Sequence, residues 1–119
     1  MLTEEEAVKF AEDWVSAWNS HDLDRIMAHY ADDVELVSPV AAQLAEKPGG
    51  RVSGKMELRN YFMKGLEAYP DLKFILKDIL LGMSSIVLYY KNQKGTHTGE
   101  FKELSPQRKI VKVVANYSA

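Results

Sequence analysis

Apolar side chains recur at helical spacing through the first third of the chain. Thr3 and Glu6 fit a capping box at the start of a helix, which we expect to run to about Asn19. Its apolar face is formed by Ala7, Phe10, Ala11, Trp14, Val15 and Trp18. Asp22 is suited to cap a second helix. The apolar positions of this second helix are Leu23, Ile26, Met27 and Tyr30.

From Asp33 the apolar period changes to two, which is typical of a half-buried strand. One face of this strand holds Val34, Leu36 and Ser38, and the other holds Glu35 and Val37. The connection 39–50 is irregular, with a helical turn expected over 41–45. Ser53 is a candidate cap for a third helix, which Pro70 ends. Its apolar face is Leu58, Tyr61, Phe62, Leu66 and Tyr69.

The remainder of the chain is rich in β-branched, aromatic and other apolar residues. We expect four strands there, over 72–81, 86–90, 96–104 and 109–117. Short polar turns separate them, so successive hairpins and an antiparallel sheet with helices on one face are predicted. The order of elements indicates one α+β domain spanning 1–119.

Composition excludes several classes of function. The chain has 119 residues, a net charge of −2 and no cysteine, so no thiolate chemistry or disulfide is expected. Basic residues form no stripe suited to nucleic acid. No apolar run approaches the roughly 20 residues of a membrane helix. The N-terminus is acidic where a secretory signal is basic, and we therefore expect a cytoplasmic protein.

Several short motifs carry a resemblance to a known family. They are W-x3-W-N-S-H-D-L over 14–23, Y-A-D-D over 30–33, Ser38-Pro39, and Y-P-D-L over 69–72. Together they resemble the SnoaL-like proteins of the NTF2-like superfamily, which includes ketosteroid isomerase and polyketide and ester cyclases. The resemblance implies a cone-shaped, cystatin-like fold. In it, three N-terminal helices pack on a strongly curved, mainly antiparallel sheet that encloses a pocket.

The resemblance also allows residues to be matched to ketosteroid isomerase. The aspartate that serves as its general base, just before a proline, is replaced here by Ser38. A serine hydroxyl does not shuttle protons at neutral pH without an activating base. The tyrosine of the first helix is replaced by Trp14, whose indole is only a donor. The acidic residue of the penultimate strand matches Glu100, our candidate catalytic residue.

The orientation of Glu100 depends on the register of its strand, because a shift of one residue turns every side chain to the other face. If Glu100 points inward, desolvation is expected to raise its pKa, so that the carboxyl can donate a proton. The alternative is a solvated glutamate on a face shared with Thr98 and Lys102. Alternation places His97, part of a G-T-H-x-G-x-F motif similar to that of ester cyclases, on the opposite face. His97 is then a surface or interface residue.

Aromatic and small residues are expected to line the pocket. The candidate pocket residues are Trp14, Trp18, Tyr30, Leu36, Ser38, Phe62, Thr98, Val113, Ala115 and Tyr117. The alternative for the aromatic side chains is an ordinary packed core. His21, His29 and His97 show no spacing of metal ligands, so neither a metal nor another cofactor is expected.

Three functions remain open at this level. The first is a cofactor-independent isomerase, cyclase or hydrolase that acts on an apolar, carbonyl-bearing or cyclic compound by acid-base chemistry. The second is a non-catalytic domain that binds or senses a small ligand. The third is a protein-interaction module. In each case we expect a homodimer formed through the convex face of the sheet, where Phe101 points outward.

Overall fold

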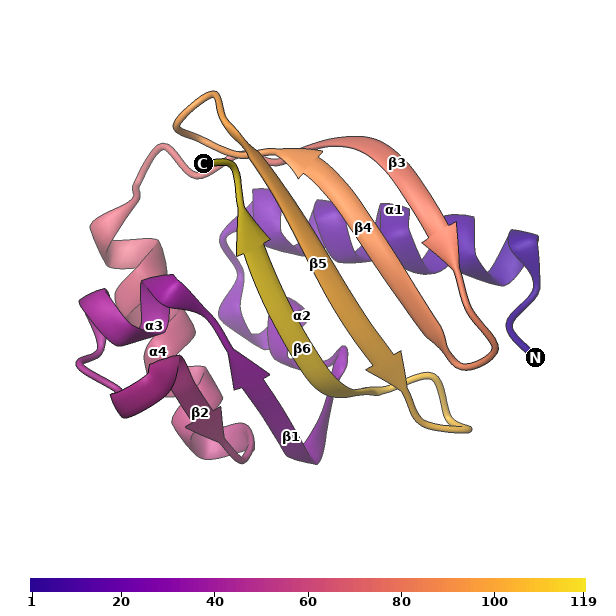
Figure 1. The fold of residues 1–119 in the computed structure, drawn as a ribbon, viewed down its shortest axis with the longest axis horizontal. Coiled ribbons are helices and arrows are strands. Elements are labelled where there is room, and N and C mark those ends of the chain that lie inside the picture. The colour runs from indigo at the N-terminus through magenta and orange to yellow at the C-terminus, as the bar shows by residue number, and fades with distance from the viewer.

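The computed structural model describes residues 1–119 as helices gathered on one side of a six-stranded sheet (Figure 1). The helices are α1 (Glu4–Ser20), α2 (Leu23–Met27), α3 (Pro39–Leu44) and α4 (Lys55–Ala68), with a 3-10 turn at Pro48–Gly50. The strands are β1 (Tyr30–Val37), β2 (Arg51–Ser53), β3 (Ile75–Leu81), β4 (Ser85–Lys91), β5 (His97–Leu104) and β6 (Ile110–Tyr117). The predicted α+β class is confirmed. None of the helices has the combination of length and hydropathy that a membrane-spanning segment requires.

The sheet has the strand order β2-β1-β6-β5-β4-β3. Strands β3 to β6 form the predicted antiparallel hairpins, and β2 pairs antiparallel with β1. Strand β1 instead pairs parallel with β6, which joins the N-terminal half of the chain to its last strand. Helix α4 packs against β1 and β2, while α1 runs along β3. The helices therefore cover the concave face of the sheet, above the inward-facing side chains.

The local signals for helix starts are mostly confirmed. The Thr3 hydroxyl accepts from the backbone N–H of Glu6, whose carboxylate accepts from Thr3 N–H, which completes the capping box. The carboxylate of Asp22 caps α2 by accepting from the next helical N–H groups. The helical turn expected over 41–45 corresponds to α3, which begins earlier, at Pro39, and ends at Leu44.

Two predicted helix boundaries are wrong, and the strand expected over 72–81 begins only at Ile75. Ser53 does not cap α4, because it ends β2 and the cap position belongs to Gly54, whose φ of 85° suits glycine. A strand of three residues is too short to show a period in the sequence, so β2 was not expected. Tyr30 begins β1 rather than continuing α2. Its helical spacing from Met27 arises because both side chains face the same core.

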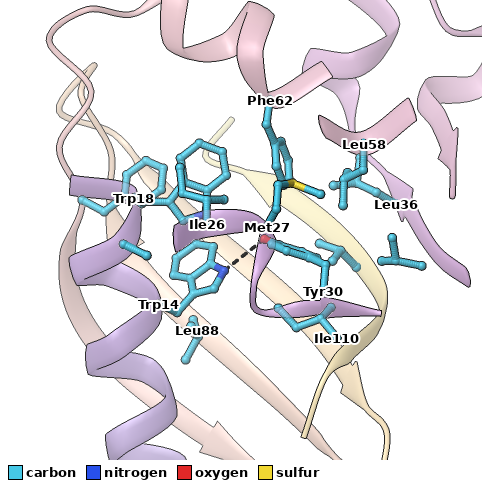
Figure 2. Packing of buried hydrophobic residues seen from close by; sticks show 14 of the residues in the cluster. Trp14, Trp18, Ile26, Met27, Tyr30, Leu36, Leu58, Phe62, Leu88 and Ile110 are labelled. Carbon is cyan, nitrogen blue, oxygen red and sulfur yellow. Dashed lines mark hydrogen bonds between the residues drawn. The ribbon is translucent and has the colours of Figure 1, made fainter. Parts of the chain in front are cut away.

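A layer of aromatic rings fills the space between α1 and the sheet. Trp14 is almost fully buried and stacks on Phe74, with ring centroids 5.7 Å apart. Its indole Nε1 donates to the Tyr30 hydroxyl over 3.1 Å (Figure 2). Phe62 of α4 packs edge-on against Tyr30 at 5.3 Å. Helices α1 and α4 are thus joined to the sheet through one continuous set of ring contacts.

The C-terminal end of α1 is tied to the segment before β3 by two polar side chains. The Asn19 amide donates to Phe74 O over 3.0 Å and accepts from Phe74 N–H over 2.8 Å. His21, in a left-handed conformation with φ 60°, donates from Nε2 to Leu72 O over 2.7 Å. This pairing satisfies backbone groups that no neighbouring strand reaches.

We predict that Asn19→Ala destabilises the protein by about 1–3 kcal/mol, because it leaves two partly buried backbone groups at Phe74 without partners. Urea unfolding monitored by tryptophan fluorescence measures this change. Asn60→Ala, at an exposed position of α4, is the matched control and is expected to change stability by less than about 0.5 kcal/mol. Equal effects of the two substitutions would contradict the role of Asn19.

Candidate functional site

A cavity of about 510 Å³ lies between the concave face of the sheet and helices α1, α3 and α4. Its walls come from β1, β4, β5 and β6, from the three helices, and from the turn that joins β4 to β5. The volume is in the range of pockets that bind small organic molecules. Aromatic side chains line much of the cavity. They are Trp18, Tyr30, Tyr61, Phe62, Tyr69, Phe74, Tyr90 and Tyr117.

Strand β5 contributes the acidic group of the cavity wall. Its even-numbered side chains point inward, so Glu100 lines the cavity and is only 8% exposed. Thr98 and Lys102, on the same face, are fully buried, and the alternative of a solvated face is therefore wrong. His97 and Phe101 lie on the opposite, convex face, and the imidazole of His97 stacks on Tyr89 with centroids 5.1 Å apart.

The Glu100 carboxylate is held by two neighbours that the sequence did not reveal. Lys102 Nζ donates to Oε1 and the Tyr90 hydroxyl donates to Oε2. Lys102 also lies over the ring of Trp14, with Nζ 3.9 Å from its centroid. Burial lowers the pKa of Lys102, and the charge of Glu100 acts in the opposite direction. The signal in the sequence was the i, i+2 spacing of Glu100 and Lys102, but a strand lysine is usually solvated.

Phenolic hydroxyls surround the carboxylate. Burial raises the pKa of Tyr61 to about 12, and the negative charge of Glu100 adds to the rise. The same two causes raise the pKa of Tyr30, Tyr90 and Tyr117. These hydroxyls are therefore protonated at neutral pH and can donate hydrogen bonds.

Two buried side-chain atoms have no hydrogen-bond partner, and both belong to residues of the cavity wall. They are Nε1 of Trp18, a donor, and Oε1 of Gln93, an acceptor. Buried polar groups in proteins normally have partners. A ligand with oxygen or nitrogen substituents could supply an acceptor for the indole N–H and a donor for the amide oxygen.

The candidate pocket residues divide into two groups. Those that line the cavity are Trp18, Tyr30, Leu36, Ser38, Phe62, Thr98, Ala115 and Tyr117. Trp14 and Val113 do not line it, which corrects their assignment. The Trp14 indole is enclosed by Phe74, Tyr90 and Lys102 below the cavity. Val113 is fully buried opposite Lys102 on the neighbouring strand, at the same depth.

Ser38, which replaces the isomerase base, has a structural role. It is buried, and its Oγ accepts from Val40 N–H over 3.1 Å as the N-cap of α3. The cap uses one of the two lone pairs of this hydroxyl. No group of three or more His, Asp or Glu side chains is placed to hold a metal ion.

Comparisons with known proteins bear on this geometry. A SnoaL-like protein of unknown function from Burkholderia thailandensis is 38% identical, with a TM-score of 0.94, covering 99% of this chain and 98% of that one. At 16% identity, the epoxide hydrolase/cyclase-like enzyme SalBIII superposes with a TM-score of 0.76 over 99% of this chain and 95% of its own. TerC, co-crystallised with polyporic acid, is 11% identical and superposes with a TM-score of 0.76 over 94% of this chain and 91% of its own.

The last two likenesses concern the fold alone, because their sequence identities are low. No curated protein matches the chain significantly in sequence. The SnoaL-like domain family matches residues 11–102, most of the chain, and the relative from Burkholderia thailandensis extends this match to nearly its full length. The chain therefore belongs to the SnoaL-like domain family and has the NTF2-like fold.

Proposed function

We propose that the cavity binds a small, largely apolar, cyclic or carbonyl-bearing compound, and that Glu100 exchanges a proton with it without a cofactor. The observation that carries this proposal is a single carboxylate on the wall of a deep aromatic cavity. Aromatic walls with a few convergent polar groups are typical of sites for small organic ligands. The cavity volume of about 510 Å³ suits a compound of a few fused or linked rings.

The chemistry that this geometry supports is a proton transfer. Glu100 takes a proton from an acidic C–H or a hydroxyl of the compound, and returns it at a second position of the same compound. Tyr30 and Tyr61 remain protonated and can donate to an oxygen on which negative charge develops. No net proton is gained or lost, so an isomerisation or a ring closure needs no further reactant.

Two known proteins of this fold support the proposed ligand class. SalBIII takes part in pyran ring formation in a polyether, and TerC has been crystallised with polyporic acid. Both involve cyclic, oxygen-bearing compounds. Tyrosine hydroxyls and the unpaired Trp18 N–H make the present cavity suited to compounds of the same general kind.

A second candidate function is ligand binding without catalysis. Its support is Ser38, which caps α3 where ketosteroid isomerase has a general base. With one acid-base group instead of two, a site can bind and orient a compound without converting it. A compound that binds and is converted indicates catalysis, whereas a compound that binds and stays unchanged indicates ligand binding alone.

We predict that some cyclic, steroidal or aromatic carbonyl compounds raise the melting temperature of the wild-type protein. A ligand at one hundred times its Kd stabilises the folded state by about 2.7 kcal/mol. Glu100→Gln is expected to weaken these shifts and to lower any turnover about 100-fold. Differential scanning fluorimetry and product analysis measure the two effects.

The control for this screen is Glu103→Gln, on the exposed convex face of the same strand, which should leave every shift unchanged. If the melting-temperature shifts are the same in Glu100→Gln as in the wild-type protein, the ligand site lies away from the carboxylate. A complete absence of shifts across the compound set would count against the proposed ligand class.

We further propose a homodimer through the convex face. The strand registers align one apolar side chain from each of five strands into a continuous row: Val37, Leu80, Val87, Phe101 and Val114. Leu80, at the β3 end of the row, is 55% exposed. A two-fold axis across the centre of the row would bring it against its own copy.

We predict that Phe101→Glu, at the middle of this row, converts the dimer into a monomer, because a desolvated carboxylate at the centre of an interface has no counter-charge. Sedimentation velocity measures the change in mass. Met63→Glu, at an exposed position of α4, is the control and should remain dimeric. A wild-type protein that sediments as a monomer at high concentration would contradict the proposed dimer.

A further inference from the structure

A buried ion pair lies directly below the cavity, and only one of its members reaches the cavity wall. Lys102 is 0% exposed and does not line the cavity, while Glu100 does. Nζ of Lys102 contacts Oε1 of Glu100 on one side and the Trp14 ring on the other. The lysine therefore has no route to a bound compound except through the carboxylate.

We propose that Lys102 is a positioning residue that holds Glu100 as a carboxylate aimed into the cavity, so that the site selects compounds presenting a hydrogen-bond donor, such as the hydroxyl of a phenol or an enol. This inference rests on the proposed ligand-binding function of the cavity and specifies its substrate class. It also assigns Glu100 the role of base rather than acid.

The first step of the argument is the identity of the groups that face Glu100. They come from every strand and helix packed around it: Tyr30 of β1, Tyr90 of β4, Lys102 of β5, Tyr117 of β6 and Tyr61 of α4. The buried side chains of helix α1 are all uncharged and include the indoles of Trp14 and Trp18. Lys94, the lysine that does line the cavity, lies over the Tyr69 ring, away from the carboxylate. Lys102 is thus the one cation in contact with the carboxylate.

The second step concerns the charge of Glu100. Burial by itself favours the neutral acid, which would donate its proton to a carbonyl oxygen. A contacting ammonium favours the ionised form instead. An isolated buried charge is far more costly than a hydrogen-bonded pair, so the two residues are expected to be charged together. Lys102 therefore decides whether the cavity presents a donor or an acceptor at this position.

The third step is the number of acceptor positions left on the carboxylate. An ionised carboxylate offers about four lone-pair sites on its two oxygens. Lys102 uses one on Oε1 and Tyr90 uses one on Oε2. The remaining sites can accept from a bound compound, because 11% of the Glu100 side chain is exposed and it lines the cavity. The two fixed donors also hold the carboxylate in one orientation.

The first experiment requires no ligand and uses the wild-type protein. The side-chain carboxyl ¹³C resonance of Glu100, assigned by its loss in Glu100→Gln, is expected to have the chemical shift of a carboxylate at pH 6 and at pH 8. A carboxylic acid signal at neutral pH would overturn the inference. This measurement does not depend on whether a lysine variant folds.

The second experiment removes the cation. In Lys102→Met the buried carboxyl loses its counter-charge and binds a proton more readily in the folded than in the unfolded state. Stability linked to that proton is present at low pH and is lost as the pH rises. The urea midpoint of Lys102→Met should therefore fall from pH 5 to pH 8 relative to Lys112→Met, which removes an exposed lysine from the neighbouring strand.

The double variant Glu100→Gln/Lys102→Met carries no buried charge and should regain most of the lost stability, with no such pH dependence. If the urea midpoints of Lys102→Met and Lys112→Met change with pH in the same way, Lys102 does not control the charge of Glu100. That result would overturn the inference even if the cavity binds ligands.

The third experiment tests the ligand class with three naphthalenes of matched shape. At pH 7 the wild-type protein is expected to bind 2-naphthol at least about tenfold more tightly than 2-methoxynaphthalene or 2-acetylnaphthalene, a difference of about 1.4 kcal/mol. In Lys102→Met this preference should shrink as the pH is lowered, whereas Lys112→Met keeps it. A preference for the acetyl compound would mean that Glu100 donates, and would overturn the inference.

The proposed function and this inference can fail separately. If none of the three probes binds but Glu100 is a carboxylate whose charge depends on Lys102, the proposed ligand site fails and the role of Lys102 stands. If the probes bind but Lys102→Met changes neither the donor preference nor its pH dependence, the ligand site stands and the inference fails.

Discussion

The desolvation of the Lys102 ammonium is the constraint on which the rest of this structure depends. An ammonium removed from water requires an anion and further favourable contacts close by. Here the anion is Glu100, two residues away on the same strand, and the face of the Trp14 ring supplies the other contact. Because Trp14 belongs to α1, the position of this helix on the sheet and the charge pair depend on each other.

Trp14 also determines where packed core ends and cavity begins. Its ring stacks on Phe74 and its Nε1 donates to Tyr30, so the space beneath these rings is filled. Tyr61 and Tyr117, by contrast, line the cavity. The same aromatic set therefore forms both a packed core around Trp14 and the wall of the cavity next to it. Some of the aromatic side chains are therefore packed in the core, and others line the cavity.

In the middle of β5, polar side chains face inward and an apolar one faces outward, the reverse of the usual pattern. The inward face carries Thr98, Glu100 and Lys102, while the outward face carries Phe101. Judged by hydrophobicity alone, Phe101 would be assigned to the core and the charged residues to solvent. The inward position of Glu100 could be expected only through resemblance to a family. Its partner Lys102 could not be expected even so, because local sequence does not distinguish a buried pair from two solvated charges.

The sequence by itself determined the elements whose signals are local. The capping box at Thr3, the cap at Asp22 and the period-two strands depend on neighbours within a few residues. Tertiary structure decided the pairing of β1 with β6, the short strand β2 and the face of β5 that is buried. It also decided the hydrogen bonds of the Asn19 side chain to the Phe74 backbone. These features join residues far apart in the chain. Their free energies depend on packing and desolvation, which exist only once the sheet has closed around the helices.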